Sequence, residues 1–144
     1  MAEIRRLALG EAASMPSPLP EVFDDAFERS VLAARLSAEG HLTVVAIDGD
    51  RTVGQCLAVV HRKADQAPDL YIDEVGVAPS HRRRGIARAL LADAVAWGRE
   101  QGCETAWLVA GADDAPARAL YDAAGWSAEP AVVYELPLTP TPDS

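Results

Sequence analysis

The sequence predicts an α/β fold in which helices flank a central, twisted, mixed β-sheet, and three observations support this. Runs of β-branched residues alternate with segments whose apolar residues recur at helical spacing. Asp48-Gly49 separates two β-branched runs, as is typical of a hairpin, so the middle strands are expected to be antiparallel neighbours. The 144 residues, 49% of them hydrophobic, suffice for one core. We expect one domain over residues 1–136 and a tail over 137–144, whose prolines cannot join a sheet ladder.

In the N-terminal half we expect a first strand, a helical region and a hairpin. After a proline-containing loop, residues 21–36 carry apolar side chains at helical spacing and predict an amphipathic helix or a helix pair. The expected strands of this half and of the middle of the chain are 3–9, 42–47, 53–60 and 70–77.

In the C-terminal half a long helix is expected to open at Gly85 and end at Gly102. Residues 105–110 predict a buried strand. A short helix follows, with Asp114 as its N-cap and Gly125 just past its end. Residues 131–136 predict a last strand.

The charge of the chain restricts its partners. The net charge is −9 and the pI is about 4.7, which disfavours nucleic acid and anionic membranes and favours cations. Cys56 and Cys103 form neither a disulfide framework nor a metal-ligand pair, so we expect no metal. No apolar stretch approaches the ~20 residues of a membrane span, and the N-terminus lacks a signal-peptide pattern. We expect a cytoplasmic protein.

The segment 75–87 is the most informative part of the sequence. A strand runs through an arginine-rich turn with Gly85 directly into a helix. The first N–H groups of a helix have no intrahelical partners and its dipole is positive there, so this turn suits a phosphate. Two alternatives are a basic helix start on the surface and a nucleic-acid patch. The acidic net charge and the shortness of the basic cluster weigh against the second.

Two motifs in the sequence resemble those of a known family. Arg82-x-x-Gly85-x-Ala87, preceded by Val75-Gly-Val77-Ala-Pro79, resembles the acetyl-coenzyme A signature of GNAT-type N-acetyltransferases. Asp114-x-x-Ala117-x-x-Leu120-Tyr121-x-x-x-Gly125-Trp126 is similar to a second element of the same family, which has Asn at the first position in many members and Phe at the last.

The nearest resemblance within the family is to the type I aminoglycoside 3-N-acetyltransferases, the gentamicin acetyltransferases. It covers residues 66–136 and includes Tyr71-Ile72, the acidic Glu74, His81-Arg82-Arg83-x-Gly85-Ile86-Ala87 and Asp114-x-Pro116-Ala117. Ala115 stands where that subfamily has a second Asp.

The resemblance implies a GNAT fold with acetyl-CoA bound where two central strands diverge. The residues implied to hold acetyl-CoA are Val75, Val77, Arg82, Arg83, Arg84, Gly85, Ile86, Ala87 and Asp114. It also implies that an amine attacks the thioester directly, with a backbone N–H of the 75–77 strand stabilising the oxyanion.

Tyr121 and Glu74 are the expected catalytic residues. By resemblance Tyr121 protonates the departing thiolate, although a tyrosine on a short helix can equally be a core residue. Glu74 is expected to act as general base through a water. Because neighbours in a strand face opposite sides, only one of Asp73 and Glu74 is expected to face the site, and the other reading of both is a solvated strand face.

An acidic wall is expected to hold a cationic substrate. Asp73, Asp113 and Asp114 are its candidates, with Asp24 and Asp25 as further members, whereas an acidic pair at a helix start also serves as a cap. The implied substrate is an aminoglycoside, acetylated at the 3-amino group. The alternatives are another small amine (a polyamine, an amino-acid derivative or a peptide N-terminus), a silent acyl-CoA sensor and a nucleic-acid module. A homodimer is expected, because dimers are common in the family.

Overall fold

The computed structural model describes residues 2–140, and the chain divides between Val109 and Ala110 into two compact units. The first unit holds the sheet with two helices, and the second holds one helix. The expectation of one domain over residues 1–136 stays a prediction. In the expected tail, residues 137–140 are neither helix nor strand, and residues 141–144 lie outside the described residues.

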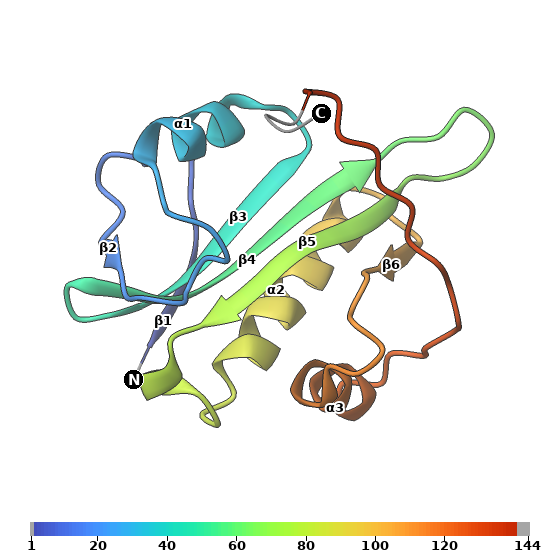
Figure 1. Cartoon of the computed structure of the whole chain (residues 1–144). Helices are drawn as coiled ribbons and strands as arrows, with labels where there is room; N and C mark the ends of the chain where they lie inside the picture. Colours follow the sequence, from blue (N-terminus) through green and yellow to red (C-terminus); the bar gives the residue numbers. More distant parts are fainter. Residues whose placement is uncertain (1, 141–144) are drawn as a thin grey trace. The chain divides into compact units, whose positions relative to one another are not determined.

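Within residues 2–140 the first unit contains a mixed sheet of six strands (Figure 1). The strands are β1 (Glu3–Arg6), β2 (Ser17–Pro18), β3 (His41–Asp48), β4 (Arg51–His61), β5 (Asp69–Val77) and β6 (Thr105–Trp107). They lie in the order β1-β3-β4-β5-β6, with β2 beside the start of β4. The pairs along β1-β3-β4-β5 are antiparallel, and β6 runs parallel to β5. The predicted mixed sheet and the β3–β4 hairpin are confirmed.

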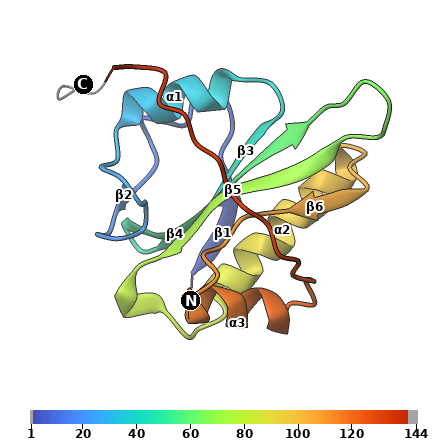
Figure 2. The ribbon, with the colours of Figure 1, turned by 45° about the vertical axis from the view of Figure 1, so that its right-hand side comes forward.

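Two helices cover opposite faces of this sheet (Figure 1 and Figure 2). Helix α1 (Arg29–Ser37) packs on the face where Leu32 joins a buried cluster with Val45 and Ile47. Helix α2 (Ile86–Glu100) buries Ile86, Leu90, Leu91, Ala94 and Gly98 against the other face. It lies very close to β4, because a Cβ at Gly54 would be 3.2 Å from side-chain carbons of Ile86 and Leu90. This packing fixes the start of α2 against the middle of the sheet.

Both ends of α2 agree with the sequence. Gly85 is its N-cap at φ 78°, a left-handed conformation that a glycine adopts without steric cost. At the other end the N–H of Cys103 bonds to the carbonyl of Gly98 at 2.9 Å, and that of Gly102 to Arg99 at 3.1 Å. These two bonds form a Schellman motif, so the helix ends where Gly102 predicts.

The expected helix over residues 21–36 is wrong in its first half, because α1 begins only at Arg29. The backbone groups of the preceding loop are bound by side chains of the sheet instead. The carbonyl of Val22 accepts from Gln55 Nε2 at 3.0 Å, and the N–H of Asp24 donates to Glu74 Oε1 at 2.9 Å. A helix here would require the same groups for its own ladder.

Two of the expected strands, 105–110 and 131–136, also differ from the structure. The strand over 105–110 is reduced to β6, which pairs only with the first three residues of β5, and its Trp107 is 42% exposed rather than buried. Residues 131–136 form no strand, and Val132, Val133, Tyr134 and Leu136 are exposed. Apolar alternation makes a strand only where a neighbouring strand supplies ladder hydrogen bonds and a covered face.

In the second unit, helix α3 (Ala115–Ala123) agrees with the sequence. The Asp114 carboxylate accepts from the N–H of Ala117 at 3.2 Å, which makes it the predicted N-cap. The helix ends as expected before Gly125, whose N–H bonds to Asp122, while the N–H of Trp126 bonds to Tyr121.

Candidate functional site

A β-bulge in β5 shapes the site. Leu57 of β4 pairs with Glu74, but the next residue, Ala58, pairs with Ile72, so Asp73 is an extra residue in β5. A bulge of this kind interrupts the alternation of side chains. Asp73 accepts from Arg35 on α1, and Arg35 and Glu74 line the same cavity. Both acidic residues therefore lie on the α1 face, but only Glu74 lines the cavity. The expectation that only one of them faces the site stays a prediction.

Glu74 is held at both oxygens. Its Oε1 accepts from the backbone N–H of Asp24 at 2.9 Å, and its Oε2 accepts from Gln55 Nε2 at 3.0 Å. Burial raises the pKa of the Glu74 carboxyl. The Asp24 N–H and the Gln55 amide oppose this rise in pKa, and the neighbouring Asp24 carboxylate adds to it. The result is a fixed carboxylate that takes up a proton more readily than an exposed glutamate.

Asp73 has a different environment, because Arg35 neutralises it. The guanidinium lies 3.4 Å from Asp73 Oδ2 and also donates to the carbonyls of Leu42 and Ala58 and to Thr43 Oγ1. Burial lowers the pKa of Arg35, and Asp73 counteracts this. The arrangement ties α1 to three strands and leaves Glu74 as the carboxylate without a cationic partner at the bulge.

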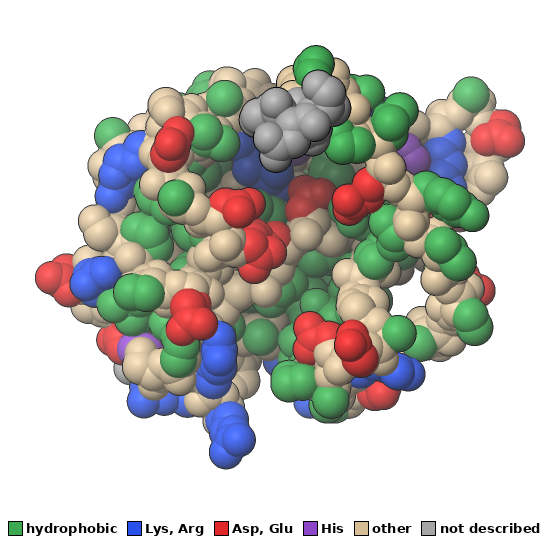
Figure 3. Space-filling model, viewed as in Figure 1, with side chains coloured by type: hydrophobic (Ala, Val, Ile, Leu, Met, Phe, Trp, Pro, Cys, Tyr) green, Lys and Arg blue, Asp and Glu red, His purple; other side chains and the backbone are tan. Residues whose placement is uncertain are grey.

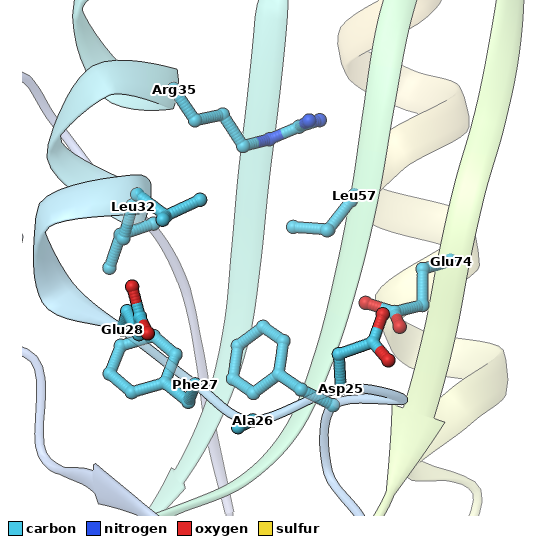
Figure 4. A pocket seen from close by; sticks show the side chains of 10 residues that line it. Asp25, Ala26, Phe27, Glu28, Leu32, Arg35, Leu57 and Glu74 are labelled. Carbon is cyan, nitrogen blue, oxygen red and sulfur yellow. The ribbon is translucent and has the colours of Figure 1, made fainter. Parts of the chain in front are cut away.

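A cavity of about 290 Å³ opens beside Glu74. Its walls are apolar side chains of the loop, α1 and β4, namely Phe23, Ala26, Phe27, Val31, Leu32 and Leu57. Its charged lining residues are Asp25, Glu28, Glu74 and Arg35, and Figure 4 shows Asp25 and Glu74 pointing toward one another. The rings of Phe23 and Phe27 stack with centroids 5.0 Å apart. An apolar cavity with three carboxylates suits an amine that carries apolar groups.

The edge of β5 that faces away from β4 is paired with β6 only at its first three residues. From Ile72 to Val77 no other strand among the described residues pairs with this edge. The unpaired part includes the expected cofactor residues Val75 and Val77. An edge of this kind offers backbone donors and acceptors to an extended ligand.

The turn between β5 and α2 has the geometry of an anion cradle. Arg83 and Gly85 both have positive φ, 64° and 78°. Among the described residues, no hydrogen bond engages the backbone N–H groups of residues 83–87. Successive free N–H groups at a helix start, with the exposed side chains of Arg82, Arg83 and Arg84 beside them, fit a phosphate. Basic side chains lie at the lower edge of Figure 3, over this turn, and acidic ones over the loop before α1.

His81 anchors this turn to the β3–β4 hairpin. Its Nε2 is 2.8 Å from Asp48 Oδ2, and its Nδ1 is 2.8 Å from Ser80 Oγ. The hydrogen bond to His81 lowers the pKa of Asp48. The turn is also tied to β5, because Arg82 Nε donates to the carbonyl of Val77 at 3.2 Å.

The remaining expected site residues lie in the second unit. Asp114 caps α3 and Asp113 precedes it, both exposed. Tyr121 is half-buried on α3, and its ring centroid is 5.8 Å from that of Trp126. The roles of these residues toward substrate and cofactor stay predictions.

Sequence reasoning missed Gln55 and Arg35. A glutamine inside the apolar run of β4 is a signal, because buried polar side chains require partners. Arg35, one turn after Leu32 on α1, carries no such signal. Burial raises the pKa of the Cys56 thiol to about 12, so it is no nucleophile. Within residues 2–140, no cluster of three His, Cys, Asp or Glu forms a metal site, and no helix is long and apolar enough to cross a membrane.

One family of known proteins matches most of this chain. The sequence pattern of the Acetyltransferase (GNAT) family matches residues 6–126. A streptothricin acetyltransferase from Streptomyces lavendulae is 33% identical over 121 residues, which are 83% of this chain. The chain spans 62% of the length of that relative.

Solved structures share the fold. An aminoglycoside acetyltransferase from an uncultured soil metagenomic sample aligns with a TM-score of 0.83 and 23% identity, over 96% of this chain and 99% of its own. AAC(6')-Iy, in complex with the bisubstrate analogue CoA-S-monomethyl-acetylneamine, aligns with a TM-score of 0.77 and 18% identity, over 96% and 99%. The chain is therefore a member of the acetyltransferase (GNAT) family, and its mixed-sheet fold is the fold of these solved structures.

Proposed function

We propose that this protein is an N-acetyltransferase, which transfers acetyl from acetyl-CoA to an amino group of an aminoglycoside, at the 3-amino position. The observation that carries the proposal is the Glu74 carboxylate at the wall of a cavity that also holds Asp25 and Glu28. A polycationic sugar is attracted by such a cavity and by the net charge of −9. The 3-N position rests on the sequence resemblance over residues 66–136, whereas one similar solved structure is AAC(6')-Iy.

The acetyl donor is proposed to lie along the β5 edge and the turn that follows it. When bound, acetyl-CoA supplies the thioester that the amine attacks. Val75 and Val77 would pair with its pantetheine arm, and the free N–H groups and side chains of residues 82–87 would hold its phosphates. Asp114 of α3 is proposed as a further cofactor contact, and Asp113 as a substrate contact.

Two side chains would move the protons of the reaction. Glu74 takes one ammonium proton through a water, which frees the nitrogen lone pair to attack the acetyl carbon, and the raised pKa of this carboxyl suits a general base. When the carbon–sulfur bond breaks, the Tyr121 hydroxyl protonates the thiolate, and the second proton of the nitrogen would return to the tyrosinate as the amide forms. A backbone N–H of the β5 edge would stabilise the charge that develops on the carbonyl oxygen.

A second candidate substrate is an amine at the end of an aliphatic arm, such as a polyamine or an aminoacyl chain. The stacked Phe23 and Phe27, with Leu32 and Leu57, make most of the cavity wall apolar. A hydrocarbon arm gains about 0.8 kcal/mol per buried methylene there. The similar protein from Streptomyces lavendulae is a streptothricin acetyltransferase, which adds streptothricin to the compounds to test.

Thiol release from acetyl-CoA tests these proposals with gentamicin, kanamycin, streptothricin and spermidine as acceptors. We expect rapid turnover of an aminoglycoside, and mass and NMR analysis of the product to place the acetyl group on the 3-amino nitrogen. Tyr121→Phe is expected to lower kcat without changing acetyl-CoA affinity. Turnover of spermidine or streptothricin alone would replace the first candidate with the second, and a 6'-N product would correct the position.

A further inference from the structure

Gln55 combines complete burial with an unusual set of hydrogen bonds. It is 0% exposed in the middle of β4. Its Nε2 donates both to Val22 O and to Glu74 Oε2, each at 3.0 Å. Among the described residues, its Oε1 is a buried oxygen without any hydrogen-bond partner. A buried acceptor without a donor destabilises a fold. The unpartnered Oε1 therefore lowers the stability of the fold, whereas the Nε2 of the same side chain donates two hydrogen bonds.

The orientation of this amide is fixed by its neighbours. Both groups at the nitrogen end are acceptors, a backbone carbonyl and a carboxylate oxygen. Turning the amide around would place Oε1 against both of them and would lose two hydrogen bonds. The nitrogen end of Gln55 must therefore face the loop and Glu74.

The loop that Gln55 holds is the one that supplies the cavity. Val22 lies two residues before Asp24, whose N–H binds the other oxygen of Glu74 at 2.9 Å. The loop lies directly on β5, because a Cβ at Gly76 would be 2.0 Å from Val22 O. Phe23 and Asp25, which alternate with these anchor residues, line the cavity. One amide thus links the base and the loop that forms the acceptor wall.

We propose that Gln55 is a positioning residue, which orients the Glu74 carboxylate and joins it to the loop of residues 22–25 that lines the acceptor cavity. This rests on the proposed role of Glu74 as general base. With one donor at each oxygen, the carboxylate plane is fixed and the remaining lone pairs stay available to a water or an amine. The donors also favour the charged form of Glu74 against its burial.

Loss of the Gln55 donor has a defined electrostatic consequence. The charged groups that face Glu74 are the carboxylates of Asp24, Asp25 and Glu28, the Asp73 next to it, and the Arg35 guanidinium. Arg35 is engaged by Asp73, so removal of the amide leaves the Asp24 N–H as the one direct donor to Glu74 among the described residues. The proton affinity of Glu74 must then increase.

The test compares Gln55→Met with Thr52→Val. Methionine keeps the length of the side chain without a donor. Thr52 is also 0% exposed on β4 and donates to a loop carbonyl, Pro16 O at 2.6 Å, but does not contact Glu74. Both variants lose a buried hydrogen bond from β4 to a loop, but only Gln55→Met also loses a hydrogen-bond donor to Glu74. Gln55→Glu is a second variant of the same shape, in case Gln55→Met does not fold.

The first readout needs no acceptor. In protein with ¹³C-labelled glutamate carboxyls, the Glu74 resonance is assigned by its loss in Glu74→Gln and titrated with pH. We expect Gln55→Met to raise its midpoint by about one pH unit, as the loss of one hydrogen bond to a charged group predicts, and Thr52→Val to leave it unchanged. An unchanged midpoint in Gln55→Met, or an equal rise in Thr52→Val, would overturn the inference.

The second readout is kcat/KM for gentamicin as a function of pH. In Gln55→Met we expect the acid limb of the kcat/KM profile to shift to higher pH by the same amount as the NMR midpoint. The loss of activity relative to the wild type then becomes smaller as the pH rises. KM for acetyl-CoA is expected to stay unchanged. A loss independent of pH would mean a merely structural role. If Glu74→Gln keeps the wild-type profile, the proposed base is wrong. If Glu74→Gln removes the acid limb and Gln55→Met does not shift it, only the role of Gln55 is wrong.

Discussion

Replacing Gly76 with alanine tests how closely the loop before α1 must lie on β5. A Cβ at this position would be 2.0 Å from the carbonyl oxygen of Val22, 3.0 Å from its carbonyl carbon and 3.2 Å from Gln55 Nε2. The atoms in the way are mostly backbone, so a rotamer change cannot relieve the overlap. The loop would have to retreat by about 1.5 Å to reach an ordinary contact near 3.5 Å.

That displacement breaks defined interactions. The bond from Gln55 to Val22 O is 3.0 Å and the bond from Asp24 N to Glu74 is 2.9 Å, so neither survives such a shift. Each buried group left without a partner costs about 1–3 kcal/mol. We expect the free energy of unfolding to fall by about 2–4 kcal/mol, and kcat/KM for the acceptor to fall about 100-fold, because misplacement by an ångström has that effect on catalysis.

Gly54→Ala is the matched control on the other face of the sheet. There the added methyl would be 3.2 Å from Ile86 Cγ2 and Leu90 Cδ1, which are flexible side-chain ends. Urea denaturation, acetyl-CoA affinity by calorimetry and acceptor kinetics are measured for both variants. We expect Gly54→Ala to lose about 1 kcal/mol of stability and to keep its acceptor kinetics. Wild-type stability and kinetics in Gly76→Ala would refute the close approach of the loop.

Three further predictions follow from burial, capping and charge. As the proposed general base, Glu74 would have to be ionised to act, and its pKa is raised. We therefore expect kcat/KM to fall as the pH drops through a midpoint above the ~4.3 of an ordinary glutamate, and Glu74→Gln to lower kcat at least about 100-fold. A pH-independent rate in the wild type would contradict this. Asp114→Ala should weaken α3 by about 1 kcal/mol, seen as faster hydrogen exchange of its amides, whereas equal exchange would contradict the cap. Leu90→Ala, at a side chain that is 0% exposed, should lower the free energy of unfolding by about 2–5 kcal/mol in urea, and a change below 1 kcal/mol would contradict its place in the core.

Elements with local signals were predictable from the sequence. The β3–β4 hairpin, the ends of α2 and the cap of α3 each depend on residues within a few positions of one another, such as Asp48-Gly49, Gly85 and Asp114. Turn and cap chemistry is short-ranged, so one stretch of sequence contains all that it needs.

Elements that depend on contacts between distant parts of the sequence were not predictable. Residues 21–28 have helical spacing, yet their backbone is bound by Gln55, 33 residues from Val22, and by Glu74, 50 residues from Asp24. The extra residue Asp73 in β5 is equally invisible, because a bulge depends on how β4 and β5 pair. The sequence indicated Glu74 and Asp73 as candidates, but it showed neither that both lie on the α1 face nor that Gln55 binds Glu74.

The same contrast separates the two halves of the reaction. The expected acetyl-CoA contacts are backbone groups and arginines within residues 75–87, one continuous stretch whose geometry is set by its own turn. The proposed acceptor cavity is assembled from a loop, α1, β4 and β5, and depends on the bulge, on Gly76 and on one buried amide. Substitutions at Phe23, Phe27 or Leu57 can therefore change which amine fits without disturbing the turn. For this reason the motif predicts the acetyl donor, whereas the acceptor has to be found from the cavity and by assay.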